Sequence, residues 1–204
     1  MTRTTRFFHT IAALCAWLAV SAGAAHAQNS EGPITLVAKP GVGPVFGETV
    51  LLAMPTENSE HVGFIINRPL PRTLASLFPE HRAARKVVDP VRFGGPEQTD
   101  TIFAIARSRG DTGGETLPLF EDLVVATRSD VIDRIIERTP NDARYFVGYV
   151  RWGARELEAE IASGIWYVID AQGDLMFRKD PHRMWEELVR RLGIEPRTPG
   201  GSAV

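Results

Sequence analysis

The sequence predicts an α+β domain, with a largely antiparallel β-sheet and helices packed outside it. Strand-length apolar runs separated by turn residues recur along the chain, and two of them, 49–53 and 62–66, flank a short polar segment typical of a hairpin loop. Amphipathic helical segments lie between such runs. Strands and helices interleave without the strict βαβ alternation of a parallel sheet, which favours α+β.

The elements of the first half are defined by their breakers. Apolar or β-rich runs are found at 34–39, 49–53, 62–66, 91–93 and 101–107. Pro40 and Gly41 stop the first run, and the polar residues 55–60 form the predicted hairpin loop. A short helix is predicted over 73–78, closed by Pro79, and the Gly- and Asp-rich residues 109–115 are predicted to be a loop.

The second half is predicted from periodicity and caps. Strands are expected at 123–127, 145–149, 165–169 and 175–178, and helices after Ser129, over 154–163 and after Asp180. Ser129 is the expected N-cap of the first helix, whose apolar stripe is Val131, Ile132, Ile135 and Ile136. In the last helix we expect Asp180 at the N-cap and Pro181 at the first helical position. Its stripe is Met184, Trp185, Leu188, Val189 and Leu192, with Gly193 as the stop.

The first residues have the pattern of a secretory signal. Arg3 and Arg6 precede an apolar stretch too short to span a bilayer, and Ala25-His26-Ala27 fits a cleavage site. We therefore expect residues 1–27 to be a signal peptide cleaved after Ala27, and the protein to be periplasmic or secreted without stable membrane insertion. An uncleaved anchor is the alternative. Residues 28–33 are expected to be a disordered linker, 34–193 a single domain, and 194–204 a disordered tail.

Composition excludes several classes of function. The single cysteine, Cys15, lies in the signal, so the exported chain has no thiol for catalysis, disulfides or metal binding. Loss of Arg3 and Arg6 changes the formal net charge from −2 to −4, which disfavours nucleic-acid binding. The one short basic run, 81–86, is interpreted as a solvated helix end or loop.

Known catalytic patterns are missing. The exported chain has His61, His81 and His182, which are not spaced as a metal pair, and it lacks nucleophile-elbow, P-loop and dinucleotide-binding signatures. We therefore predict no catalytic residues, metal or cofactor, and no enzyme activity. A hydrolase-like site assembled in three dimensions around one of these histidines stays open as an alternative.

Two turn motifs have both a structural and a functional interpretation. Asn67-Arg68-Pro69 follows a strand, so Arg68 either meets an anionic ligand at the strand end or pairs with a neighbouring acid. Gly94-Gly95-Pro96 provides either a structural turn or a nest of backbone donors for an anion.

The segment 146–153 combines glycines and aromatic residues. Gly148 within a strand suggests the close approach of another element, under Trp152 or Trp166, and Gly153 suggests a turn into the next helix. Glu156 and Glu160 lie one helical turn apart, as paired carboxylates would, but alternating charge on this segment favours a solvated face.

These motifs, taken in order, resemble the YqgE/AlgH family. The similarity rests on Gly63 to Leu70, Gly94-Gly95-Pro96, Gly148-Tyr149, Trp152-Gly153 and Trp166, together with shorter matches between residues 34 and 193. The resemblance implies an α+β fold with a bifurcated, barrel-like sheet and no established enzyme activity. It also implies the transcriptional-regulator label that members often carry, which conflicts with the signal and the charge. Arg151 replaces a small residue of the family pattern.

The sequence therefore predicts a non-enzymatic binding or accessory module, with an unidentified protein or a small anionic ligand as its partner. The predicted ligand site combines a cation, backbone donors and an aromatic wall. Its residues are Asn67, Arg68, Gly94, Gly95, Tyr149 and Trp152.

Overall fold

The computed structural model describes residues 32–43, 46–108 and 116–193 of the chain. The predicted signal peptide, most of the predicted linker, the loop 109–115 and the tail 194–204 lie outside the described residues. None of the helices in the described segments is long and apolar enough to cross a membrane.

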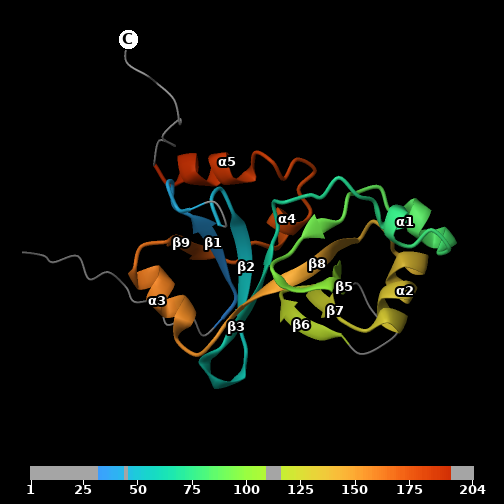
Figure 1. The fold of residues 1–204 in the computed structure, drawn as a ribbon, viewed down its shortest axis with the longest axis horizontal. Coiled ribbons are helices and arrows are strands. Elements are labelled where there is room, and N and C mark those ends of the chain that lie inside the picture. Colours follow the sequence, from blue (N-terminus) through green and yellow to red (C-terminus); the bar gives the residue numbers. More distant parts are fainter. Residues whose placement is uncertain (1–31, 44–45, 109–115, 194–204) are drawn as a thin grey trace, which may run out of the picture.

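The described residues form a nine-stranded sheet that curls into a half-barrel (Figure 1). Its strands are β1 (Ile34–Ala38), β2 (Val50–Pro55), β3 (His61–Ile65), β4 (Arg92–Phe93), β5 (Glu97–Arg107), β6 (Leu117–Phe120), β7 (Leu123–Ala126), β8 (Ala143–Trp152) and β9 (Trp166–Asp170). The order is β6-β7-β5-β8-β3-β2-β1-β9, and β4 pairs with β8. Every pairing is antiparallel except that of β4 with β8, so the predicted α+β class is confirmed.

The long strand β8 joins the two halves of the sheet. Its first part pairs with β5, from Ala143 opposite Ala106 to Tyr149 opposite Glu97. Its last three residues pair with β3 instead, as Trp152 does with His61. Because one strand serves both neighbours, β8 positions residues of the two halves against each other.

Helical segments lie around the sheet. They are α1 (Leu74–Leu77), α2 (Ser129–Arg138), α3 (Glu156–Ala162), α4 (Gly173–Met176) and α5 (Met184–Arg191), with 3₁₀ turns η1 (Glu57–Ser59) and η2 (Arg82–Lys86). Figure 1 shows α5 along the β1 side, α3 beside β9, and α1 with α2 at the opposite end of the molecule. The predicted stripe of α2 is buried in full, because residues spaced three and four apart share one face of the helix.

The predicted strand at 175–178 is wrong, because this segment contains the short helix α4 and the residues that end it. Successive residues of a strand point to opposite faces, whereas in α4 the neighbours Leu175 and Met176 are both buried in one core cluster. An apolar run this short does not distinguish the two conformations.

Three further boundaries differ from the prediction. Ser129 is the first residue of α2, and Arg128 occupies the N-cap position. Helix α5 begins at Met184, and Asp180 instead accepts a hydrogen bond from the backbone N–H of His182 (3.2 Å), within the turn before the helix. Leu192 lies past the end of α5 and is 38% exposed. Strand β6, a four-residue edge strand that contains Pro118, was not predicted.

Candidate functional site

Asn67 and Arg68 hold the segment before β2 in place. Asn67 is buried, accepts a hydrogen bond from the backbone N–H of Val50 (2.9 Å) and donates one to the carbonyl of Glu48 (2.8 Å). The Arg68 guanidinium donates to the Thr49 hydroxyl (2.8 Å), and its partial burial lowers its pKa. Among the described residues Arg68 therefore pairs with a hydroxyl and a carbonyl rather than with an acidic side chain, and its ligand role stays a prediction.

Gly94, Gly95 and Gly148 form a contact between backbones that we call the glycine joint. The N–H of Gly94 donates to Val147 (2.8 Å) and its carbonyl accepts from Ile65 (2.8 Å), so both groups are used within the sheet. A Cβ atom on Gly148 would lie 2.3 Å from the carbonyl oxygen of Gly95. The close approach predicted at Gly148 is therefore present, but the neighbour is Gly95 rather than a tryptophan.

Trp152 and Trp166 donate hydrogen bonds to the same carboxylate. The indole N–H groups of Trp152 and Trp166 both donate to Oε2 of Glu160, at 2.9 and 2.7 Å, and both rings are buried. Glu156 accepts from the backbone N–H of Gly153 (2.9 Å). The interpretation of these carboxylates as a solvated helix face is therefore wrong for Glu160, whose partners come from β8 and β9.

Tyr149 is the member of the predicted set that lines a pocket, a groove of about 580 Å³ between the β2–β3 hairpin and β6. Its ring meets Phe103 edge to face, with centroids 5.6 Å apart, and Phe103 meets Phe64 in the same way. We call this the apolar groove. Its lining includes Met54, Val62, Phe64, Phe103, Leu119 and Tyr149.

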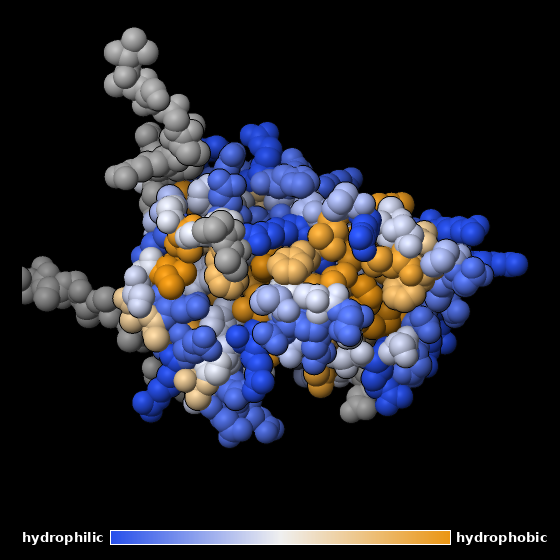
Figure 2. All heavy atoms as spheres, viewed as in Figure 1, coloured by the Kyte–Doolittle hydropathy of each residue, from blue (hydrophilic) through white to orange (hydrophobic). Residues whose placement is uncertain are grey.

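The lining of the apolar groove is uncharged and mostly apolar. None of its lining residues is charged; Thr56, Gln98, Thr127 and the Tyr149 hydroxyl are its polar groups. Leu117 of β6, at its edge, is 57% exposed. Figure 2 shows the notch between the hairpin and β6, with hydrophobic and hydrophilic side chains mixed around it. Sequence reasoning did not find the groove because its residues come from seven separated segments.

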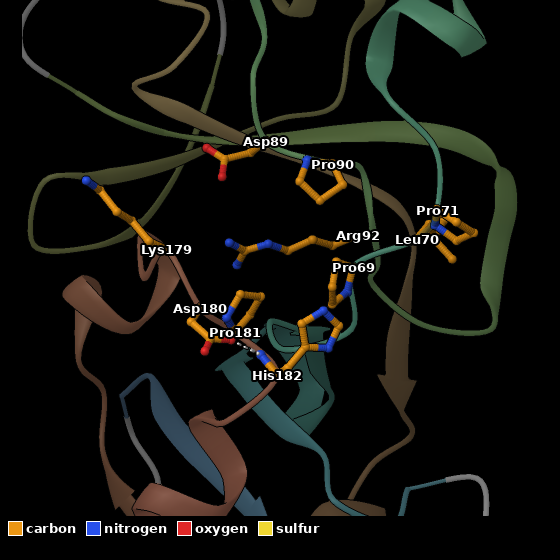
Figure 3. Close-up of a pocket in the computed structure, with 10 residues that line it drawn as sticks. All are labelled: Pro69, Leu70, Pro71, Asp89, Pro90, Arg92, Lys179, Asp180, Pro181 and His182. Carbon is orange, nitrogen blue, oxygen red and sulfur yellow. Dashed lines mark hydrogen bonds between the residues drawn. The ribbon is translucent and has the colours of Figure 1, made fainter.

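A second pocket, of about 390 Å³, lies between the segment after β3 and the turn before α5 (Figure 3). Pro69, Pro71, Pro90 and Pro181 line it together with charged residues. We call it the Arg92 pocket, after the buried arginine of β4 whose guanidinium points into it. Sequence reasoning missed Arg92, because one arginine before Gly94-Gly95 carries no pattern of its own.

The three histidines lie in three different surroundings and do not form one site. His61 is buried and neither ring nitrogen has a partner among the described residues, whereas His81 lies 3.4 Å from Asp133 near α2. His182 lines the Arg92 pocket. Within the described segments, no three His, Asp or Glu side chains are grouped so that they could hold a metal ion.

Arg151, which departs from the family pattern, lines neither of these two pockets. It is exposed and donates to Glu60 at 2.9 Å, and this hydrogen bond raises its pKa. Since Glu60 follows η1 and Arg151 lies in β8, the pair links the hairpin loop to the strand that joins the halves of the sheet.

Comparisons with known sequences agree with the motif order. A family model described as AlgH-like matches residues 35–197. A UPF0301 protein of Chlorobium limicola is 33% identical over 160 residues, which cover 77% of this chain and 83% of the relative. A UPF0301 protein of Bordetella petrii is 36% identical over 148 residues, covering 70% and 72% of the two chains.

Solved structures share the fold. The solution structure of AlgH from Pseudomonas aeruginosa superposes with a TM-score of 0.66 and 26% identity, over 83% of this chain and 94% of that one. A crystal structure of a Corynebacterium diphtheriae protein gives a TM-score of 0.65 at 20% identity, over 78% and 85% of the chains, and supports the fold alone. With a family model that matches most of the chain, relatives above 30% identity and a shared fold, this protein belongs to the AlgH-like family.

Proposed function

We propose that this protein is a non-enzymatic binding module whose apolar groove takes an extended, apolar segment of a partner protein. The observation that carries the proposal is an uncharged groove that runs beside a sheet edge. Among the described residues β6 pairs on one side only, with β7, and its residues Leu117 and Leu119 also line the groove.

The free side of β6 favours a polypeptide over a small molecule. An extended peptide can add to a sheet edge through its backbone, while its alternate side chains enter a neighbouring apolar pocket. Burial of large apolar side chains in a groove of this volume would supply about 1.5–3 kcal/mol each. The absence of charge in the lining disfavours a small anion here, because an unpaired charge would lose its hydration.

The accessory role in the exported compartment is part of the same proposal and rests on the signal pattern at 1–27. N-terminal sequencing of the protein recovered from the periplasmic fraction tests it. A chain that begins at Gln28 supports export and cleavage, and an intact chain confined to the cytoplasm contradicts them.

The groove is tested by selecting peptides from a random displayed library on the wild-type protein. We expect enriched peptides to carry bulky apolar side chains at alternate positions and to lose at least about tenfold in affinity for the Leu117→Asp variant. Val88→Asp is the matched control, because Val88 is 76% exposed and does not line the groove. The proposal is contradicted if both variants lose affinity equally or if the selected peptides bind elsewhere on the protein. It is also contradicted if an excess of a second apolar peptide fails to displace the selected peptides.

A further inference from the structure

The buried charge of Arg92 has no ion-pair partner among the described residues. Its side chain is only 2% exposed, and Nη1 donates to the carbonyls of Ile66 (2.8 Å) and Met176 (2.9 Å). The nearby Asp89 forms its ion pair with Arg144 instead, at 3.2 Å. Burial and the charge of Arg144 lower the pKa of Arg92 to about 10, although the charge of Asp89 acts in the opposite direction. The guanidinium is therefore held by carbonyls, with no carboxylate of the described residues in direct contact.

The guanidinium of Arg92 points into the pocket and has unused donors. Nε and Nη2 of Arg92 donate to no described residue, and neither is sealed from solvent. Figure 3 shows the guanidinium between Asp89 and Pro181, directed toward the side where Lys179 lies. The Nε and Nη2 hydrogens of an arginine form a planar fork that matches the two oxygens of a carboxylate.

The remaining charges favour a single negative charge on the ligand. Arg92 and Lys179 line this pocket together with Asp89 and Asp180. Asp89 is paired with Arg144, which lies outside the lining, so the two cations of the lining face the one unpaired carboxylate of Asp180. A ligand with two negative charges would be repelled by both carboxylates. The backbone N–H of His182 donates to the side-chain carboxylate of Asp180, which ties the two residues in one turn.

The walls favour a hydrocarbon body on the same ligand. Four prolines and Leu70 line the pocket, and proline has no backbone N–H with which to bind polar groups. A volume of about 390 Å³ is at the small end of the range for small-molecule sites.

We propose that the Arg92 pocket binds a small monocarboxylate with a compact hydrocarbon body. The carboxylate lies on the Nε and Nη2 edge of Arg92 with Lys179 at the mouth, and the hydrocarbon body packs on the proline walls. This site shares no lining residue with the apolar groove, so a failure of either proposal leaves the other one unaffected.

The test is a titration of the full exported chain with sodium benzoate, followed by amide and arginine Nε–H NMR signals. We expect saturable shifts of the Arg92 Nε–H signal and of amides in the segments 70–72, 89–92 and 179–182. Lys179→Glu should weaken binding about three- to tenfold by reversing a charge at the mouth. Lys86→Glu makes the same change in total charge on an exposed side chain of η2, outside the pocket, and should leave the affinity unchanged.

Three ligands and one further variant make the outcome decisive. Benzamide, which has the ring without the charge, should bind at least about tenfold more weakly than benzoate. Arg92→Lys keeps the positive charge but loses the planar fork of two N–H donors. If its amide spectrum shows that it folds as the wild type does, we expect it to bind benzoate more weakly. The proposal is overturned by equal binding of benzamide, by inorganic phosphate that binds more tightly than benzoate, by shifts outside the pocket only, or by a Lys179→Glu variant that behaves as Lys86→Glu does.

Discussion

The glycine joint and the two pockets use different kinds of residue. At the joint, Gly95 and Gly148 bring two backbones within a distance that no side chain tolerates, and nearby indoles share one carboxylate. The pockets are built from common apolar residues, prolines and one buried arginine, contributed by segments far apart in the chain. Residues that stand out in the sequence here serve close packing, while the open surface is assembled from residues that do not stand out.

This difference separates stability from binding. Substitutions at the joint should lower the free energy of unfolding, because they create clashes or leave buried donors without acceptors. Substitutions at exposed positions of the pockets should change binding and leave stability almost intact. Three experiments test the separation, in order of decreasing effect.

The largest effect is expected for Gly148→Ala. The new Cβ would lie 2.3 Å from the Gly95 carbonyl oxygen and 2.6 Å from that of Glu97, and residue 148 has a positive φ of 69°. Since both neighbours are backbone atoms, we expect a loss of at least about 3 kcal/mol in urea unfolding.

Gly41→Ala is its matched control. Gly41 has a similar φ of 87°, but nothing lies within 4 Å of the new Cβ, so only the backbone cost of about 1 kcal/mol is expected. Equal losses in the two variants would show that the joint is no tighter than an ordinary turn.

A smaller loss is expected for Glu160→Ala. The variant removes the acceptor of two indole N–H groups, and the two buried donors left behind should cost about 2–3 kcal/mol together. Glu158→Ala changes an exposed glutamate of the same helix and should stay within about 0.5 kcal/mol of the wild type. Unfolding followed by tryptophan fluorescence measures the stability of both variants. If Glu160→Ala loses no more stability than Glu158→Ala, then Glu160 does not stabilise the packing of the two tryptophans.

The smallest effect on stability is expected for the groove variant Leu117→Asp. Leu117 is already 57% exposed, so its replacement should change the free energy of unfolding by only about 0.5 kcal/mol while it abolishes peptide binding. If Leu117→Asp instead destabilises the protein as strongly as Glu160→Ala, then the groove is part of the core and the contrast fails.

Elements with a complete pattern were predictable. The stripe of α2 and the β2–β3 hairpin depend on local geometry, so the sequence indicated both correctly. Helix α4 and strand β6 were not predicted. Helix α4 has no capping side chain, unlike the equally short α1, and Pro118 is an unfavourable residue in the strand β6. For Arg68, the sequence indicated a charge at a strand end but not its partners, the Thr49 hydroxyl and the Gly47 carbonyl.

The candidate sites were harder to predict than the fold. Of the six predicted ligand residues, Gly94 and Gly95 belong to the joint, Asn67 and Trp152 are buried with partners of their own, and Tyr149 lines the groove. A ligand role for this set stays a prediction. No sequence pattern connects Pro69 to Pro181 or Phe64 to Leu119, which the fold brings to the same pocket.

The sequence by itself determined the α+β class, the family and the positions where glycine was required, because periodicity, motif order and backbone freedom are local properties of the chain. Only the tertiary structure decided that Glu160 accepts from two tryptophans, that Arg92 is buried against two backbone carbonyls, and that an uncharged groove runs beside β6. These three features depend on which distant segments meet across the curled sheet. That meeting is set by the packing of the whole core, which no short stretch of sequence contains.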